Sequence, residues 1–432
     1  MPEKMKRKMN TPRTTKILHA LELTGLYVLA FSLPSMTAPK HFGFAFLAIG
    51  AIGKKLADPG RKLKLPDGFE WGLICLCFFA SLSAMVNLPS FEGMHGVKDT
   101  CRYSMLAYIM YRMRPTNQEI RGWIWALSTG LVVASVWGVV DYVAGRRDFL
   151  ELHGSGLVTH ASIYVAIMIV VFLSVVLDNR SSFPRRDKLI MAGLFLITIP
   201  WLFLMGSRGT IAGLFVALLF ISLVLFKNKK FRRIVMLSGT LTGIVIFICF
   251  FFFPTSPVSE RMTHLVSTKF DFDTLSLSLY ESDQIRFECW QLGVAQATQG
   301  DRKILGIGPG NYRTIDPDRF TFENPPVFIR EKHIRPTHGH NMYITKWAEE
   351  GILGLIVLVA FQVYVLGRFW ASRPREGMIS WEWVAGAGAF IIPIVAGQFH
   401  SRFIYEFAWL SMMLTGYALG RANPPEPGDS GR

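Results

Sequence analysis

Two histidines stand close together in the run His338-Gly339-His340-Asn341, where a long apolar segment begins. An imidazole has an ordinary pKa of about 6.5, so it can accept a proton at neutral pH. The start of a helix disfavours the imidazolium form and helps to keep such a base unprotonated. No third ligand stands at the spacing usual for zinc, which argues against a metal site. The pattern predicts a general base, and a structural helix cap is the alternative.

Two arginines could bind an anion, one between two apolar segments and one in a long, more polar stretch. Arg208 is flanked by Gly206 and Gly209, which give its backbone room to turn towards a ligand. Arg286 stands four residues before Trp290, on the same face if this stretch is helical. Each arginine has a plainer interpretation. Arg208 could reach lipid headgroups from the end of a span, and Arg286 could form an ion pair or cation–π contact within its loop.

A glycine-rich run, LGIGPGNY at 305–312, resembles a phosphate-binding loop only superficially. It lacks the Lys-Ser/Thr pair of a P-loop, so we expect a turn.

Two Asp-x-Asp pairs, at 271–273 and 316–318, match the metal motif of nucleotide-sugar glycosyltransferases. Nucleotide sugars are cytoplasmic, whereas both pairs fall outside in the orientation derived below, and we discount them.

Apolar segments make up most of the chain and position these motifs. Of its 432 residues, 51% are hydrophobic and only 18% charged, too few charges to cover a soluble protein of this length. The apolar runs approach the roughly 20 residues that cross a ~30 Å hydrocarbon core. They are continuous rather than alternating, which excludes a β-barrel. The sequence therefore predicts an all-α polytopic membrane protein of about 12 transmembrane helices, at residues 17–35, 41–53, 69–87, 100–112, 120–144, 159–177, 189–205, 209–226, 234–253, 340–367, 379–398 and 403–420.

The distribution of charge orients this chain in the membrane. The net charge is +15, but the basic residues form short clusters between the apolar segments, which is typical of membrane proteins rather than of nucleic-acid-binding proteins. Placing the basic arm 1–16 in the cytoplasm puts most basic residues of the short loops inside as well. Both termini are then cytoplasmic, and the long segment 254–339 lies outside.

The predicted organisation has five parts. They are the cytoplasmic arm 1–16, transmembrane helices 1–9 within 17–253, a partly helical outer loop 254–339, transmembrane helices 10–12 within 340–420, and the cytoplasmic tail 421–432. Under this threading Arg208, Arg286, His338 and His340 all lie on the outer face.

The order and spacing of the motifs resemble those of the bacterial O-antigen ligase and O-antigen polymerase superfamily of membrane glycosyltransferases. The matching pieces are SRG at 207–209, R-x-x-x-W at 286–290, LGIGPGNY at 305–312 and HGHNMYITKWAEEGILG at 338–354. The resemblance is strongest from 205 to 355, and the single large loop is more like the ligase. It implies a GT-C-like fold in the bacterial inner membrane, with the loop and the active site in the periplasm.

The resemblance also implies a reaction. Such a ligase transfers O-antigen glycan from undecaprenyl diphosphate to a sugar hydroxyl of lipid A-core, inverting the anomeric carbon, with no metal and no other cofactor. Arg208 and Arg286 match arginines that would hold the diphosphate, which suits a guanidinium fork. His338 would be the base, with His340 as the alternative or as its supporting partner. We expect further substrate contacts from the same motifs, at Trp290, Tyr312, Asn341 and Tyr343.

Two other functions remain open at this stage. An O-antigen polymerase would lengthen glycan on the same lipid carrier, and the sequence separates it poorly from a ligase. A membrane transporter of a lipid or glycan would place ionisable residues near the middle of the membrane, whereas the candidates here gather at one face. The partners expected are the lipid-linked donor, the lipid A-core acceptor and membrane lipids, without nucleic acid. The sequence leaves the oligomeric state open.

Overall fold

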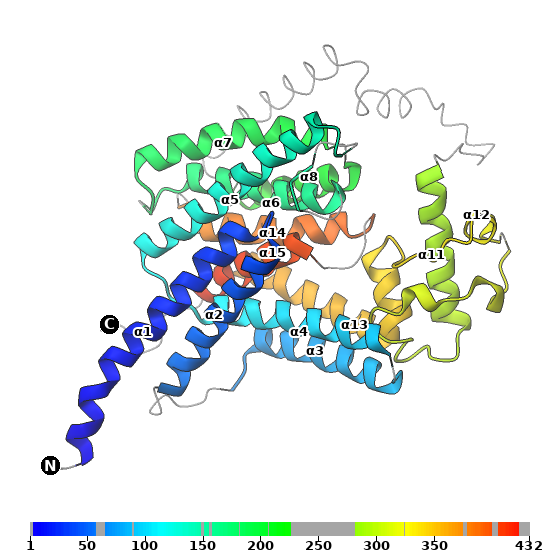
Figure 1. Ribbon diagram of the computed structural model, residues 1–432, viewed down its shortest axis with the longest axis horizontal. Coiled ribbons are helices and arrows are strands. Elements are labelled where there is room, and N and C mark those ends of the chain that lie inside the picture. Colours follow the sequence, from blue (N-terminus) through cyan, green and yellow to red (C-terminus); the bar gives the residue numbers. More distant parts are fainter. Residues whose placement is uncertain are drawn as a thin grey trace.

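The computed structural model describes residues 3–57, 65–88, 90–147, 151–154, 158–180, 182–205, 207–225, 281–323, 325–374, 378–399 and 405–422. Within them every regular element is a helix (Figure 1). The α-helices are α1 (Glu3–Ser32), α2 (Thr37–Ala57), α3 (Gly68–Val86), α4 (Phe91–Arg112), α5 (Asn117–Val143), α6 (Val158–Leu177), α7 (Arg185–Leu204), α8 (Arg208–Leu225), α11 (Glu281–Gln299), α12 (Val327–Glu331), α13 (Met342–Ala371), α14 (Trp381–Ala396) and α15 (Tyr405–Ala422). Two short 3-10 helices, Tyr312–Thr314 and Pro317–Arg319, lie between α11 and α12.

A helix covers each predicted apolar segment that the structure describes, although α1 and α4 begin well before the predicted segments at 17–35 and 100–112. Six helices are long and apolar enough to cross a membrane: α3, α5, α6, α7, α8 and α13. The apolar helix α14 is shorter, and α4 carries charged residues along its length. A helical, polytopic membrane protein is confirmed, while the count of twelve spans stays a prediction. The predicted span 234–253 and the first part of the outer loop, up to residue 280, lie outside the described residues.

Polar residues between the apolar runs set where helices begin. Asp67 caps α3 by accepting hydrogen bonds from the backbone N–H groups of Phe69 and Glu70, and the Glu70 carboxylate accepts from the Asp67 N–H in return. Glu70 also receives two hydrogen bonds from Arg112 at the end of α4. Such a capping box satisfies backbone donors that the first helical turn leaves without partners. Caps and ion pairs together therefore fix one end of the α3–α4 pair.

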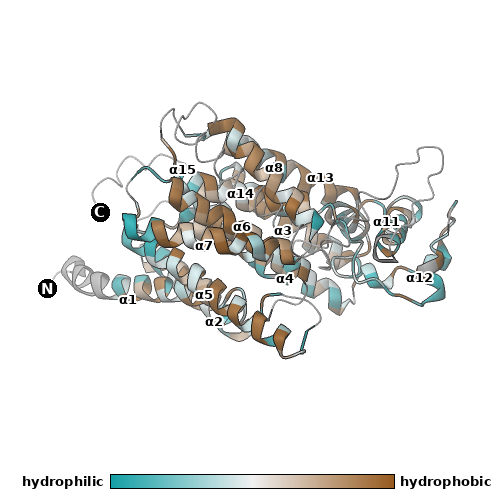
Figure 2. Cartoon of the chain, turned by 90° about the horizontal axis from the view of Figure 1, so that it is seen from above, coloured by the Kyte–Doolittle hydropathy of each residue, from teal (hydrophilic) through white to brown (hydrophobic). Residues whose placement is uncertain are grey.

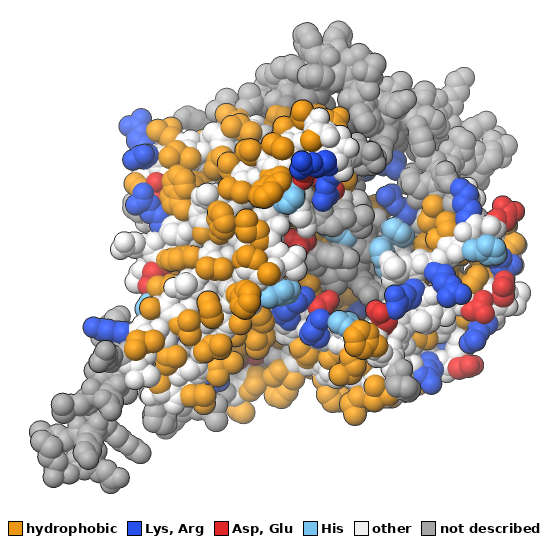
Figure 3. Space-filling view, viewed as in Figure 1, with side chains coloured by type: hydrophobic (Ala, Val, Ile, Leu, Met, Phe, Trp, Pro, Cys, Tyr) orange, Lys and Arg blue, Asp and Glu red, His pale blue; other side chains and the backbone are white. Residues whose placement is uncertain are grey.

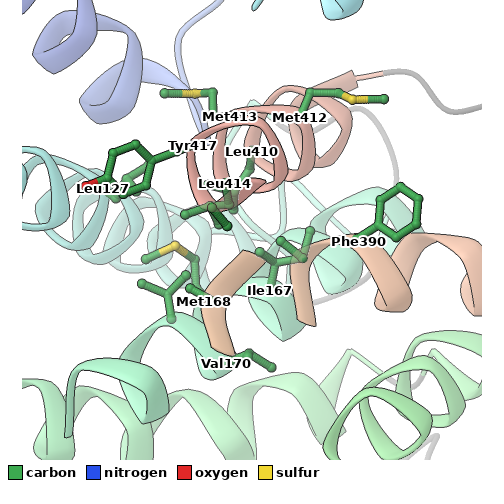
Figure 4. Close-up of a cluster of buried hydrophobic side chains, with 14 of the residues drawn as sticks. Leu127, Ile167, Met168, Val170, Phe390, Leu410, Met412, Met413, Leu414 and Tyr417 are labelled. Carbon is green, nitrogen blue, oxygen red and sulfur yellow. The ribbon is translucent and has the colours of Figure 1, made fainter. Parts of the chain in front are cut away.

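The centre of the bundle is α6, which is buried along nearly its whole length. It packs against α7, α8, α14 and α15. Figure 4 shows Ile167 and Val170 of α6 beside Phe390 of α14 and Leu414 of α15. A helix that is apolar on all sides is stable only when other helices or lipid surround it, and here other helices do.

The helices that carry the predicted motifs meet at one end of the bundle, which we call the site end. There α3 ends, and α4, α6, α8 and α13 begin. Ser83 near the end of α3 donates hydrogen bonds to the carbonyls of Leu305 and Glu349. In Figures 1 and 2, α11 and α12 lie beyond this end, and hydrophilic residues are more frequent there than along the bundle. Figure 3 shows the surface hollowed between the bundle and this part, with histidine and basic side chains at its borders.

Candidate active site

The turn that holds both histidines is fixed to the start of α13. Asn341 caps this helix by accepting from the N–H groups of Tyr343 and Ile344, at 2.9 and 3.1 Å. The Gly339 N–H donates to Thr345 Oγ1 at 3.0 Å, and that hydroxyl donates to the Asn341 carbonyl at 2.7 Å. The alternative prediction of a structural cap is thus confirmed for Asn341, and this cap holds the histidines in place.

His338 and His340 lie against each other, with ring centroids 4.4 Å apart. The Thr337 hydroxyl lies 2.8 Å from His338 Nδ1. His340 has φ +48°, in the left-handed region that a non-glycine residue seldom adopts. Such strain persists only where the surrounding contacts enforce it, and it often marks a functional site.

Arg286 of α11 acts electrostatically on His340. His340 precedes the α13 span by two residues and is half-buried. Burial, and next the positive charge of Arg286, lower the pKa of His340 to about 4. Both causes disfavour a second positive charge. His340 is therefore a neutral imidazole at neutral pH, and the structure brings the loop arginine and the histidine turn together.

Arg208 is the first residue of α8, with an exposed side chain. The residues beside it are held by a chain of buried hydroxyls: Ser207 Oγ lies 2.8 Å from Thr210 Oγ1, which lies 2.9 Å from Ser162 Oγ of α6. Two residues before Ser162, buried His160 stacks on Phe407 and interacts electrostatically with His340. The first turn of α6 therefore links the Arg208 motif to the histidine turn.

The glycine-rich run is a structural turn, as predicted. The N–H groups of Ile307 and Gly308 donate to the carbonyls of Ala348 and Glu349 in α13, at 3.2 and 2.8 Å. Those carbonyls can accept because α13 is broken at Gly351, where φ is +69°. These two amides are engaged with α13, so they do not form a phosphate cradle.

Tyr312 joins α11, α13 and the histidine turn. It is fully buried, its N–H donates to Glu349 Oε1 at 3.1 Å, and its hydroxyl donates to the Cys289 carbonyl at 2.5 Å. Gly339 lies so close that a Cβ there would be 3.0 Å from the Tyr312 hydroxyl. This burial favours a supporting role over the substrate contact predicted from the sequence.

The other expected substrate contacts are also partly engaged in the fold. The Asn341 side chain caps α13 and donates from Nδ2 to the Gln398 carbonyl at 3.0 Å. The Tyr343 hydroxyl donates to Gln362 at 2.9 Å. Trp290 is half-buried, and its Nε1 has no hydrogen-bond partner among the described residues. Their contact with substrate stays a prediction.

Sequence reasoning missed three supporting residues: His160, Thr345 and Glu349. A histidine at the start of an apolar run is itself a signal, because ionisable residues near the membrane interior are costly. Thr345 and Glu349 lie inside the motif at 338–354, but no role was predicted for them because their partners are backbone groups or residues distant in sequence. No group of three His, Cys, Asp or Glu residues in the described part of the chain could hold a metal ion.

Residues 192–359 match the family model described as O-antigen ligase. The matched stretch contains Arg208, Arg286, His338 and His340 and the glycine-rich run that joins them. None of the curated proteins compared with the chain matches it. Residues 192–359 are therefore similar to the O-antigen ligase family, and the resemblance to the O-antigen ligase superfamily predicted from the sequence is confirmed.

Proposed function

We propose that the protein is an O-antigen ligase, which transfers glycan from undecaprenyl diphosphate to a sugar hydroxyl of lipid A-core at the periplasmic face of the bacterial inner membrane. The observation that carries the proposal is the meeting of Arg286 with the strained His338–His340 turn, inside the stretch that matches the ligase family. A cationic group beside a neutral imidazole suits a reaction with an anionic leaving group and a proton to remove.

In the proposed reaction the acceptor oxygen attacks the anomeric carbon of the donor sugar. The bond from that carbon to the diphosphate oxygen breaks, and undecaprenyl diphosphate leaves with the electron pair. The acceptor's hydroxyl proton passes to an imidazole. Arg208 and Arg286 hold the diphosphate and stabilise its growing negative charge, because a guanidinium offers several N–H donors in a plane that matches phosphate oxygens. Attack opposite the leaving group inverts the anomeric centre.

The two histidines are suited to different tasks. His340, with a pKa of about 4, is a weak proton acceptor near neutral pH. His338 is half-buried, and with Nδ1 protonated and donating to the Thr337 hydroxyl, its Nε2 carries the lone pair. We therefore assign His338 as the base and His340 as the neutral residue that positions it.

The test is transfer by the purified protein in nanodiscs, supplied with lipid-linked O-antigen and rough lipopolysaccharide. The expected product is glycan on the lipopolysaccharide, without added metal or nucleotide. Lengthened glycan on the carrier would instead identify a polymerase. Transfer to neither acceptor, with lipid-linked glycan moved across the bilayer of proteoliposomes that contain the protein, would identify a transporter and overturn the proposal.

A further inference from the structure

A second group of cationic side chains lies at the site end, outside the residues already assigned. One stripe of α4 carries Phe91, His95, Lys98 and Arg102, spaced so that they share a helical face. Lys98 lies 3.0 Å from His95 Nδ1. Arg102, Lys98 and buried Lys40 of α2 all act electrostatically on exposed His41. We call His41, Lys98 and Arg102 the α2–α4 patch.

The guanidinium of Arg102 is held in place by its neighbours. It donates to Asp99 at 2.7 Å and lies 4.7 Å from the centre of the Trp409 ring, with a side chain 18% exposed. Its Nε makes no hydrogen bond within the described residues. Asp99 accepts from one nitrogen of a group with five N–H donors. Arg102 is thus fixed on one side and keeps donors for an anion.

A buried ion pair lies next to the patch and connects the helices that carry it. Lys40 donates to Glu406 of α15 at 2.6 Å, and both side chains are almost fully buried. Burying two charges is costly, and such a pair stabilises a fold less than an apolar pair of the same size. The pair joins α2 to the first turn of α15. Because α15 also carries Trp409, which lies against Arg102, the pair fixes α2 and α15 on either side of the patch.

Apolar side chains surround the patch on the molecular surface. Phe42 of α2 is 63% exposed, and Phe91 and Met94 of α4 are 78% and 57% exposed. A solvated charged face would lack these large hydrophobic neighbours, whereas cations beside exposed apolar groups suit a lipid whose headgroup carries the negative charge. Two carboxylates, Asp99 and Glu406, stand against three cations, Lys98 and Arg102 of the patch and the adjoining Lys40, so the patch favours a localised anion over a general negative surface.

The patch lies across α6 and α15 from Arg208, one of the two proposed donor arginines. The first turn of α15 contacts Lys40 through Glu406 and stacks Phe407 on His160, which interacts with His340. Arg208 begins α8, which contacts α6, whereas α4 contacts α15. In Figure 1, α8 and α4 accordingly lie on opposite sides of α6 and α15. The first turns of α6 and α15, which reach the histidine turn through His160, thus lie between Arg208 and the patch.

We infer that the α2–α4 patch binds a phosphate group of the lipid acceptor, and so holds its sugar hydroxyl on the side of α6 and α15 opposite Arg208. The inference rests on the proposed function, which requires an acceptor that is both lipid-anchored and anionic. Attack opposite a leaving group needs the acceptor hydroxyl and the diphosphate on opposite faces of the anomeric carbon, and substrates that approach from opposite sides of α6 and α15 suit that geometry.

The test compares Lys98→Gln/Arg102→Gln with a matched control, Lys55→Gln/Arg373→Gln. The control also removes one lysine and one arginine: Lys55 lies near the Tyr108 hydroxyl, and exposed Arg373 lies over Trp370, away from the site end. Full-length protein in nanodiscs is assayed with rough lipopolysaccharide and with the same acceptor after its phosphates are removed. We expect the acceptor KM of the patch variant to be about tenfold higher than that of the natural protein, which corresponds to the loss of a charge-assisted hydrogen bond. Its kcat and its donor KM should be unchanged. With the phosphate-free acceptor, the patch variant and the natural protein should have the same acceptor KM.

An unchanged acceptor KM in an active patch variant would overturn the inference while leaving the ligase function intact. So would an equal rise with the phosphate-free acceptor, or a rise in donor KM. Binding of rough lipopolysaccharide, measured without donor, separates the two proposals: phosphate-dependent binding lost only in the patch variant supports the site even if transfer fails. Displacement of the lipid by millimolar inorganic phosphate would contradict our assignment of a lipid ligand.

Discussion

The helices α6 and α13 were both predicted as apolar spans, yet they differ in almost every structural respect. α6 is continuous, buried along its length and surrounded by other helices. α13 begins after a strained histidine, is broken at Gly351 and buries two carboxylates, Glu349 and Glu350, beside the break. α6 is packed as expected for a stable buried helix. The strained residue before α13, and the break and the buried carboxylates within it, all lie in the stretch that matches the family model. Such departures from regular packing are expected at functional sites, where the rest of the fold offsets their cost.

The largest effect should come from the two arginines proposed to hold the diphosphate. We expect Arg208→Ala or Arg286→Ala to lower transfer by about 10³-fold or more, because each removes charge stabilisation of the leaving diphosphate. The measurement is glycan transfer at equal amounts of protein in the membrane. An active Arg286→Ala variant would rule out the diphosphate-holding role.

Replacing the proposed base should have the next largest effect. His338→Ala should lower kcat by about 10²- to 10³-fold, the usual contribution of a general base. The matched change in the central helix is His160→Ala, which we expect to affect kcat less, since His160 supports the turn from behind. If His160→Ala costs more than His338→Ala, the assignment of the base is wrong.

Acid should destabilise the protein through His340. Its pKa is about 4 when folded and about 6.5 for an ordinary histidine, so the unfolded chain binds the extra proton between these values. Stability from this residue is complete above pH ~6.5 and falls as the pH drops towards 4, by about 3 kcal/mol in all. Thermal unfolding of His340→Asn, followed from pH 7 to 4, should show a shallower decline than the natural protein. Parallel declines would contradict the burial of a neutral imidazole.

The break in α13 can be tested with two glycines of the same helix. A Cβ at Gly351 would overlap the Ile304 carbonyl, and the substituted residue would have to adopt a φ of +69°. Gly367, by contrast, has open space around its Cβ position. Gly351→Ala should destabilise the protein by about 2 kcal/mol or more. Gly367→Ala should be neutral or stabilise it by up to about 1 kcal/mol. Equal melting temperatures for the two variants would show that the break is not required.

The smallest effect concerns the support beneath the histidine turn. Tyr312→Phe removes the hydrogen bond to Cys289, which contributes about 1 kcal/mol, and should lower kcat several-fold. Its control is Tyr364→Phe, which removes a phenol hydroxyl bonded to Arg368 near the far end of α13. Tyr312 holds α11, and α11 carries Arg286, which acts on His340. Tyr312→Phe should therefore also shift the pH at which kcat falls on the acid side of its pH profile. A fall in melting temperature alone would make Tyr312 purely structural.

Periodicity and charge located most elements of the fold, because each apolar run specifies a helix through local hydrogen bonding and transfer from water. The prediction was weakest at α4. Its stretch at 100–112 is barely hydrophobic, because one face of the helix carries the charged residues and the other packs on α3 and α15. Residues 226–280, which include a predicted span, lie outside the described residues, so the order of helices there stays a prediction.

The sequence by itself determined the helical class, the membrane setting and the short motifs around Arg208, Arg286 and the two histidines. These depend on composition and on residues near one another in the chain. Only the tertiary structure decided that Tyr312 is buried, that the glycine-rich run binds a broken α13, that His160 interacts with His340, and that α2 and α4 together form the α2–α4 patch. Those features depend on contacts between residues far apart in sequence, such as Lys40 and Glu406. No local pattern specifies which helices pack together, because that choice depends on the shapes and charges of all of them at once.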